Sequence, residues 1–258
     1  MRLNAAAARA LAGAAALVIL GSIAVAAPAG SSLRQAIADP SRGQQRERDA
    51  RRHPAELVAL ADLKPGQRVL DLIPGDGYWT HIFSRMVGPG GRVYAVWPQA
   101  YAREAAPDVD EVRALSAKPE FRNVTTLVQP SVQLSAPEPL DVVWTVQNYH
   151  DYNDKFMGSP GTASLNQAVF RMLKPGGLYI VIDHASAPHR GMNDTETLHR
   201  IERATVIQQA TAAGFQLVGE SRALSNPKDP HTIAVFDKSI RGHTDQFALK
   251  FRKPSTKR

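Results

Sequence analysis

Apolar residues along this chain gather in short runs, and the segments between the runs place their apolar positions three or four residues apart. Such runs, bounded by glycines and other turn residues, are typical of buried parallel strands. They cover residues 68–72, 92–97, 123–128, 140–146 and 178–182. The segments with helical spacing cover residues 54–61, 79–87, 163–173 and 195–213. Strands and helices in alternation predict an α/β fold, Rossmann-like, with a mostly parallel sheet and helices on both faces.

The carboxyl-terminal part has a different pattern. Residues 215–224 and 246–252 both have the composition of strands, and the second alternates apolar and polar positions. No helix is predicted between them, so we expect the two strands to pair antiparallel. The link at 225–245 is long, and we expect it to be either functional or poorly ordered. A further strand at 232–236 is an alternative within it.

The first residues have the pattern of a targeting segment. Arg2 and Arg9 precede or flank an apolar stretch at 11–25, and small residues follow at 24–26. The stretch is short for a membrane span of roughly 20 residues, so residues 1–29 are expected to be a cleaved bacterial signal peptide. The protein is then exported, to the periplasm. An uncleaved amino-terminal anchor is the alternative.

The rest of the chain divides into three parts. Residues 30–54 are polar and are expected to form a solvated lead-in, residues 55–253 one domain, and residues 254–258 a basic tail. The formal net charge is +7, but no basic stripe interleaved with aromatic residues accompanies it, so we expect a small-molecule partner and no nucleic acid. No stable membrane span is expected after signal cleavage, and the oligomeric state is left open. The chain has no Cys, which excludes a disulfide framework.

A glycine-containing loop follows the first predicted strand. Asp71 ends that strand, and Pro74-Gly75-Asp76-Gly77 leads into the next helix. Glycines allow conformations and close approaches that a Cβ would block, and the helix presents its first N–H groups to a ligand. Ligands of open parallel sheets bind beyond the carboxyl ends of the strands. Thr80 stands where a dinucleotide motif has its third glycine, which disfavours a nicotinamide site.

Three motifs together resemble class I S-adenosylmethionine-dependent methyltransferases: residues 63–72, residues 74–78 and residues 173–177. A little-characterised predicted bacterial methyltransferase group with a signal peptide is more similar still. That resemblance is carried by residues 148–151, 183–184, 199–200 and 241–245. It extends over roughly residues 50 to 253. It implies an enzyme, S-adenosylmethionine as cofactor, and a seven-stranded sheet whose last strand is antiparallel.

The resemblance also implies a set of cofactor-binding residues. These are Asp71, Pro74, Gly75, Asp76, Gly77, Trp97 and Asn148. The chain departs from the family at the end of the second strand, where Trp97 stands in place of the acid that usually holds the ribose. The third strand runs into Gln129 without the usual acid near the adenine amine. We expect Trp97 to stack on adenine.

Three loops rich in His, Asp and Arg are predicted to meet at the edge that carries the glycine loop. They span residues 147–154, 183–194 and 225–245. His150 is the candidate general base, because imidazole titrates near neutral pH, and Asp151 or Asp183 would orient it. The alternative is that these side chains only tie their loop to the backbone.

The acceptor is expected to contact residues from the same three loops. The candidates are Tyr149, Asp183, His184 and Arg241. Arg241 would clamp an anionic acceptor, with a surface salt bridge as the alternative, whereas for His184 and His199 a structural role is the simpler expectation. No closely spaced pair of ligands lies on one helix or strand, so no metal site is expected.

The pattern therefore predicts methyl transfer from S-adenosylmethionine to an unidentified small molecule. Such an enzyme mainly aligns the nucleophile with the methyl group and, for oxygen or nitrogen acceptors, removes a proton. The alternative is an exported, non-catalytic binding module that keeps the fold. The missing ribose acid and the export signal favour that alternative, since the cofactor is made in the cytoplasm.

Overall fold

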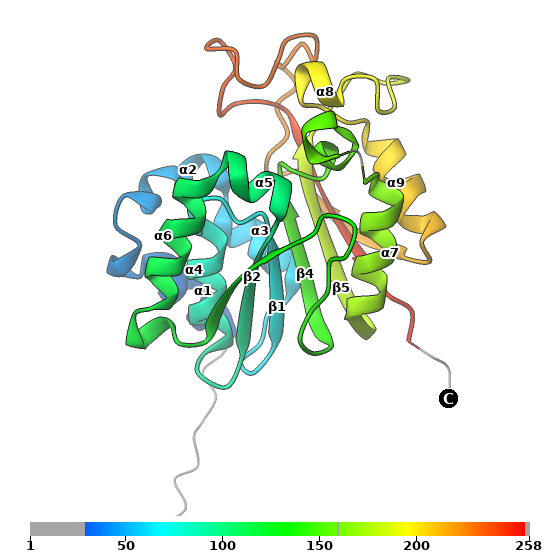
Figure 1. Cartoon of the computed structure of the whole chain (residues 1–258). Coiled ribbons are helices and arrows are strands. Elements are labelled where there is room, and N and C mark those ends of the chain that lie inside the picture. The colour runs from blue at the N-terminus through cyan, green and yellow to red at the C-terminus, as the bar shows by residue number, and fades with distance from the viewer. Residues whose placement is uncertain (1–28, 159, 256–258) are drawn as a thin grey trace, which may run out of the picture.

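Seven strands form one twisted sheet in the computed structural model, which describes residues 29–158 and 160–255 (Figure 1). The order across the sheet is β3-β2-β1-β4-β5-β7-β6. Neighbouring strands are parallel except β7, which runs antiparallel to both β5 and β6. The strands are β1 (Arg68–Leu72), β2 (Arg92–Pro98), β3 (Val124–Gln129), β4 (Leu140–Val146), β5 (Leu173–His184), β6 (Gln216–Ser221) and β7 (Gln246–Arg252). The predicted fold class, including the antiparallel last strand, is confirmed.

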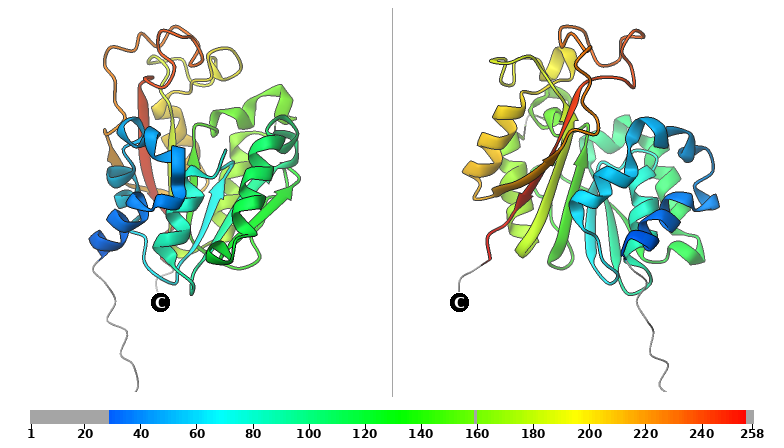
Figure 2. Two further views of the ribbon diagram at one scale, coloured as in Figure 1. Left: turned by 90° about the vertical axis from the view of Figure 1, so that its left-hand side faces the viewer. Right: turned by 180° about the vertical axis from the view of Figure 1, so that it is seen from behind.

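Helices cover both faces of this sheet, as the two views of Figure 2 show. The α-helices are α1 (Ala29–Ala38), α2 (Asp49–Arg52), α3 (Pro54–Ala61), α4 (Tyr78–Val87), α5 (Gln99–Glu104), α6 (Ala106–Ser116), α7 (Thr162–Met172), α8 (Thr195–Leu198) and α9 (Arg203–Ala212). Short 3-10 segments are η1 (Pro40–Arg48), η2 (Pro119–Phe121), η3 (His150–Asn153) and η4 (Lys155–Met157). None of the helices in the described part of the chain is long and apolar enough to cross a membrane.

Large aromatic side chains fill the core on each side of the sheet. The register pairs Val143 with Tyr179, so Tyr179 and the next residue of β4, Trp144, point to opposite faces. On one face the Trp144 ring lies 5.2 Å from the rings of both Trp79 and Phe83 of α4. On the other face Tyr179 packs 5.3 Å from Phe215. The two layers fix the strand ends, and the loops that follow them, in place.

The segment at 30–54 is not the solvated lead-in that its polar composition predicts. It forms α1, η1 and α2, and α1 packs against α4 with Ala36 only 2% exposed. Arg42 is buried and pairs with Asp49 through two hydrogen bonds of 2.9 and 2.6 Å. Asp49 also accepts a 2.5 Å hydrogen bond from the Tyr78 hydroxyl. Two of the charges that suggested solvation, Arg42 and Asp49, are therefore paired with each other. The predicted signal peptide lies outside the described residues, apart from its last one.

The single long helix predicted at 195–213 is wrong, because the chain breaks into α8 and α9. His199 ends α8 in the left-handed region, with φ of 53°. Arg200 then turns inward, is fully buried, and holds Asp229 through bonds of 2.9 and 3.0 Å. A buried ion pair requires both charges to meet, so tertiary contact overrides the helical spacing. The same pair orders the 225–245 link, in which residues 232–236 form no strand.

Candidate functional site

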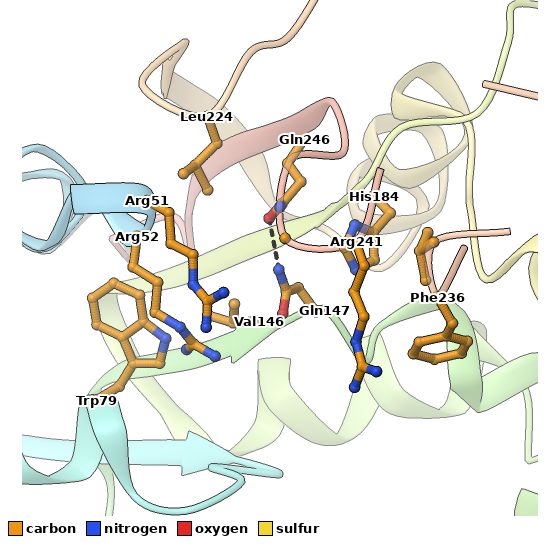
Figure 3. A pocket seen from close by; sticks show the side chains of 12 residues that line it. Arg51, Arg52, Trp79, Val146, Gln147, His184, Leu224, Phe236, Arg241 and Gln246 are labelled. Carbon is orange, nitrogen blue, oxygen red and sulfur yellow. Dashed lines mark hydrogen bonds between the residues drawn. The ribbon is translucent and has the colours of Figure 1, made fainter. Parts of the chain in front are cut away.

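The three loops predicted to converge do meet at the carboxyl edge of the sheet. Ala185 after β5 forms a parallel bridge with Ile201, and Val235 of the link donates its N–H to Leu198. Gln147, after β4, donates its side-chain amide to Gln246 at the start of β7, 3.1 Å away. Beneath these contacts lies a cavity of about 250 Å³. Its walls come from α2, α4, the loop after β4, the end of β5 and the link (Figure 3).

Three guanidinium groups give this cavity, hereafter the arginine pocket, its charge. Arg51 and Arg52 of α2 lie beside each other on one wall, and Arg241 of the link extends into the same space (Figure 3). No carboxylate within the described ranges stands at ion-pair distance from any of the three. Burial, with Arg48 nearby, lowers the pKa of Arg52. Arg51 and Arg241 are exposed to solvent and Arg52 is half-buried, where the more distant carboxylate of Asp76 also acts on it. Three like charges around one cavity make the arginine pocket positively charged.

The remaining walls of the arginine pocket are a mixture of amide, imidazole and apolar groups. Gln147, His184 and Gln246 supply the polar ones. Trp79 has a buried indole N–H without a hydrogen-bond partner. An unpaired buried donor costs free energy, so this N–H is poised for a ligand acceptor. The apolar lining consists of Val146, Leu224, Val235 and Phe236 besides Trp79.

The glycine loop has the backbone geometry expected of it. Gly75 and Gly77 have φ of 57° and 79°, in the region that disfavours a Cβ. A Cβ on Gly77 would also come within 2.9 Å of Val112. Asp71 is 1% exposed and accepts a 2.7 Å hydrogen bond from the Thr80 hydroxyl. Burial raises the pKa of Asp71 to about 7.

None of the predicted cofactor residues lines the arginine pocket. Asp76 faces η1 instead, where its carboxylate pairs with Arg48 and its carbonyl accepts from Gln45 at 2.9 Å. Asn148 donates to the carbonyls of Leu72 and Val146 at the ends of β1 and β4. These residues brace the strand ends rather than contact the pocket.

The remaining predicted cofactor residues were expected to contact the ligand directly. Trp97 is fully buried, and its indole N–H, like that of Trp79, has no partner. Stacking of Trp97 on adenine stays a prediction. So do cofactor contacts by Asp71, Pro74, Gly75, Asp76, Gly77 and Asn148.

A second cluster, formed by His150, Asp151, Asp183 and His199, lies next to the arginine pocket. Nδ1 of His150 lies 2.8 Å from Asp183, and Nε2 lies 3.1 Å from Asp151 and 3.4 Å from Nδ1 of His199. Burial lowers the pKa of His150, but the carboxylates of Asp183 and Asp151 outweigh burial and raise that pKa well above its usual value. The role of His150 as a general base stays a prediction.

The four predicted acceptor residues separate into two pairs. His184 and Arg241 line the arginine pocket. Tyr149 does not line the arginine pocket. Its hydroxyl donates to the side chain of Gln209 at 2.9 Å and accepts from the side-chain amide of Asn166 at 2.8 Å. Asp183 is fully buried, where it accepts from the backbone N–H of His150 and of His184.

Sequence reasoning missed Arg51, Arg52 and His199. The two arginines lie in a segment that was expected to be solvated. Their position just before Pro54, the first residue of α3, is the one feature of the sequence that could have indicated a contact with the domain. His199 was placed inside a helix, where its ring would have no reason to face His150. Both omissions follow from the two wrong predictions of local structure.

Comparison with known proteins places the chain among methyltransferases. The family model described as protein-L-isoaspartate(D-aspartate) O-methyltransferase (PCMT) matches residues 42–209, more than half of the chain. The ubiquinone/menaquinone biosynthesis C-methyltransferase UbiE of Shewanella frigidimarina is 27% identical over 201 residues, 78% of this chain and 68% of that protein. A protein-L-isoaspartate O-methyltransferase of Aeropyrum pernix is 37% identical over 73 residues, so the match spans only 28% of this chain and 25% of that relative.

A solved structure supports the same fold. The S-adenosylmethionine-dependent methyltransferase from Aquifex aeolicus superposes with a TM-score of 0.55 at 18% identity, and the match covers 87% of this chain and 98% of that one. At this identity the likeness concerns the arrangement of strands and helices.

Proposed function

Because this chain belongs to the protein-L-isoaspartate(D-aspartate) O-methyltransferase family, we propose that it methylates a carboxylate-bearing small molecule held in the arginine pocket. Family and fold make it an S-adenosylmethionine-dependent methyltransferase of class I. The observation that carries the proposal is the set of guanidinium groups of Arg51, Arg52 and Arg241, which line one cavity together.

The residues present fit S-adenosylmethionine at the β1 and β4 side of the arginine pocket. Arg52 would hold the carboxylate of its methionine part, and the unpaired Trp79 N–H would donate to a polar atom nearby. When bound, this cofactor supplies an electrophilic methyl group on a positively charged sulfur.

The acceptor is proposed to lie on the opposite side, between Arg51 and Arg241. The Arg51 guanidinium lies 3.1 Å from where a Cβ on Gly242 would be, so the wall formed by α2 approaches the link next to Arg241. A carboxylate is ionised at neutral pH and needs no base to become a nucleophile. Fixing its two oxygens by guanidinium groups would therefore supply the alignment on which methyl transfer depends. Base catalysis by His150, with Asp151, is not required for such an acceptor.

The test is S-adenosylhomocysteine formation with three classes of acceptor: an L-isoaspartyl peptide, a panel of small dicarboxylates, and quinols. Turnover is expected with a carboxylate acceptor. Arg241→Gln should raise its KM by about 10- to 100-fold, since a hydrogen bond to a charged group contributes about 1.5–3 kcal/mol. Lys238→Gln, an exposed cation of the same link, is the matched control and should change nothing. Turnover of quinols alone would overturn the carboxylate assignment.

Calorimetric titration with S-adenosylhomocysteine distinguishes the proposed cofactor side of the arginine pocket from the proposed acceptor side. Arg52→Gln should weaken S-adenosylhomocysteine binding by about 10-fold or more, whereas Arg241→Gln should leave that affinity unchanged. The reverse pattern would exchange the proposed places of cofactor and acceptor. Binding of the cofactor without turnover of any acceptor would favour the non-catalytic alternative.

We also propose that the protein is exported, to the periplasm. The support is the amino-terminal pattern of Arg2 and Arg9 with the apolar stretch at 11–25. Fusion to a reporter enzyme that is active only outside the cytoplasm should give activity, and deletion of residues 1–29 should abolish it. Equal reporter activity from both fusions would contradict export.

A further inference from the structure

The cluster beside the arginine pocket brings together one ligand atom each from three side chains. Nε2 of His150, Oδ1 of Asp151 and Nδ1 of His199 form a triangle with sides of 3.1, 3.4 and 3.7 Å. A point about 2.0 Å from each corner of such a triangle exists, and about 2.0–2.2 Å is the length of zinc bonds to histidine nitrogen and to carboxylate oxygen. The three atoms are thus spaced as metal ligands are, without any movement of the chain.

The groups around this triangle hold its ligands in the orientation that a metal needs. Asp183 binds Nδ1 of His150 at 2.8 Å, which places a hydrogen on Nδ1 and turns Nε2 toward the other two ligands. Asp183 is itself fixed by two backbone N–H groups at 2.9 and 2.8 Å. The Tyr101 hydroxyl bonds to Asp151. A carboxylate behind a ligating histidine is the usual support of a metal-bound imidazole.

Charge balance also favours a cation. With neutral imidazoles, the carboxylates of Asp151 and Asp183 leave two negative charges in a buried place. The buried guanidinium of Arg200 is already paired with Asp229. A divalent ion would balance both charges, and buried charges are stable only when paired or bound to a metal.

We propose that His150, Asp151 and His199 form a binding site for a divalent transition metal ion of the zinc class. Two imidazoles and one carboxylate suit Zn²⁺, Co²⁺ or Fe²⁺, whereas Mg²⁺ prefers oxygen ligands only. Three protein ligands leave a coordination position open for water or a substrate oxygen, as in catalytic rather than structural zinc sites. This assignment departs from the expectation of no metal drawn from the sequence, where His199 seemed to belong to a continuous helix.

The site has access to solvent and adjoins the arginine pocket. The His199 side chain is 28% exposed, so ions reach the cluster without unfolding. The ring of Phe236, a wall residue of the arginine pocket, lies 4.8 Å from the His199 ring. The His184 ring, also in that wall, lies 6.2 Å from the His150 ring. A metal at the cluster would lie directly behind this wall.

Titration of the purified, chelator-treated protein with Co²⁺ tests the proposal, because cobalt bound to nitrogen and oxygen ligands absorbs visible light. We expect one Co²⁺ per chain, displaced by one Zn²⁺, and no binding of Mg²⁺ at equal concentration. His199→Ala and Asp151→Asn should each weaken Zn²⁺ binding by about 100-fold or more. Asp183→Asn, which removes only the support of His150, should weaken it by about 10- to 100-fold.

The matched control is His243→Gln, which changes an exposed histidine of the nearby link and should leave Zn²⁺ affinity unchanged. Circular dichroism of each variant establishes that it is folded. Because His199 is partly exposed, His199→Ala changes no side chain of the hydrophobic core. Binding of less than one tenth of an equivalent of Co²⁺ by the wild type would overturn the proposal. So would equal Zn²⁺ affinity of His199→Ala and His243→Gln. Neither cofactor nor acceptor is present in this titration, so its failure leaves the proposed methyl transfer untouched.

Discussion

At the scale of single residues, the buried pair of Arg200 and Asp229 attaches the 225–245 link to the end of α8 and β5. Both side chains are 0% exposed, and the guanidinium also donates to the carbonyls of Ala185 and Ile233. Asp229→Asn would leave the Arg200 charge buried without a counter-ion. We expect a loss of about 3–5 kcal/mol in the free energy of unfolding, measured by urea denaturation.

The control for that change is an ion pair at the surface. Arg203 and Glu220 are more than 40% exposed and lie 2.5 Å apart. Arg203→Gln should cost less than about 1 kcal/mol. If the two variants are equally stable, the link is held by its other contacts and the buried pair has no special part in it.

A second residue, His81, should make stability depend on pH. Burial lowers the pKa of His81 to about 4, and neighbouring Arg85 and Lys118 act in the same direction against the carboxylate of Asp39. The unfolded chain, with an ordinary pKa near 6.5, therefore binds a proton that the folded chain rejects. Stability should fall by up to about 3 kcal/mol as the pH drops from about 6.5 to 4, and change no further below that range for this group.

Urea denaturation of the wild type and of His81→Asn at a series of pH values measures the effect. The difference between the two proteins removes the contribution of the other titrating groups. A difference that stays constant between pH 7 and pH 4 would show that His81 titrates alike in the folded and unfolded states.

At the scale of elements, the turn between β1 and α4 needs a glycine for two reasons. Gly77 combines a φ of 79° with a distance of 2.9 Å between its would-be Cβ and Val112 of α6. Gly77→Ala should lower the free energy of unfolding by about 1–3 kcal/mol, because strain and overlap both act there. Gly90→Ala is the matched control, since nothing lies within 4 Å of a Cβ at that position. Equal stability of the two variants, by thermal or urea unfolding, would contradict the account.

The elements also show how far the sequence predicts this structure. The five parallel strands, the closing antiparallel pair and the meeting of three loops follow from periodicity and sheet topology, which depend on local patterns. The helices of the amino-terminal segment and the break in the helix predicted at 195–213 do not follow from such patterns. In both, an arginine is buried together with an aspartate, Arg42 with Asp49 and Arg200 with Asp229, and such pairing leaves no periodic signal in the sequence. The residues of the site that were missed, Arg51, Arg52 and His199, lie in these same two segments.

At the scale of the whole molecule, the arginine pocket joins the two ends of the domain. Arg51 and Arg52 come from α2, whereas Arg241 and Gln246 come from the link and β7. A ligand that contacts both walls stabilises both. Saturating S-adenosylhomocysteine together with a carboxylate acceptor should therefore slow amide hydrogen exchange at 49–53 and at 240–246.

The same hydrogen-exchange experiment includes an internal control segment. Residues 119–123, between α6 and β3, lie away from the arginine pocket and should exchange at an unchanged rate. Protection confined to residues 71–77 would mean that ligands bind at the glycine loop alone and that the arginine pocket serves another purpose.

The division of the arginine pocket between the two ends of the chain has a consequence for biosynthesis. A ribosome adds Gln246 195 residues after Arg51, so the walls of the cavity meet only after the segment between them has been made. Contacts so distant in sequence are the slow ones to form. A messenger truncated between codons 185 and 241 would encode a product that retains the glycine loop and the strands β1 to β5 but lacks one wall of the cavity. If the acceptor binds in this cavity as proposed, such a product has no complete acceptor site.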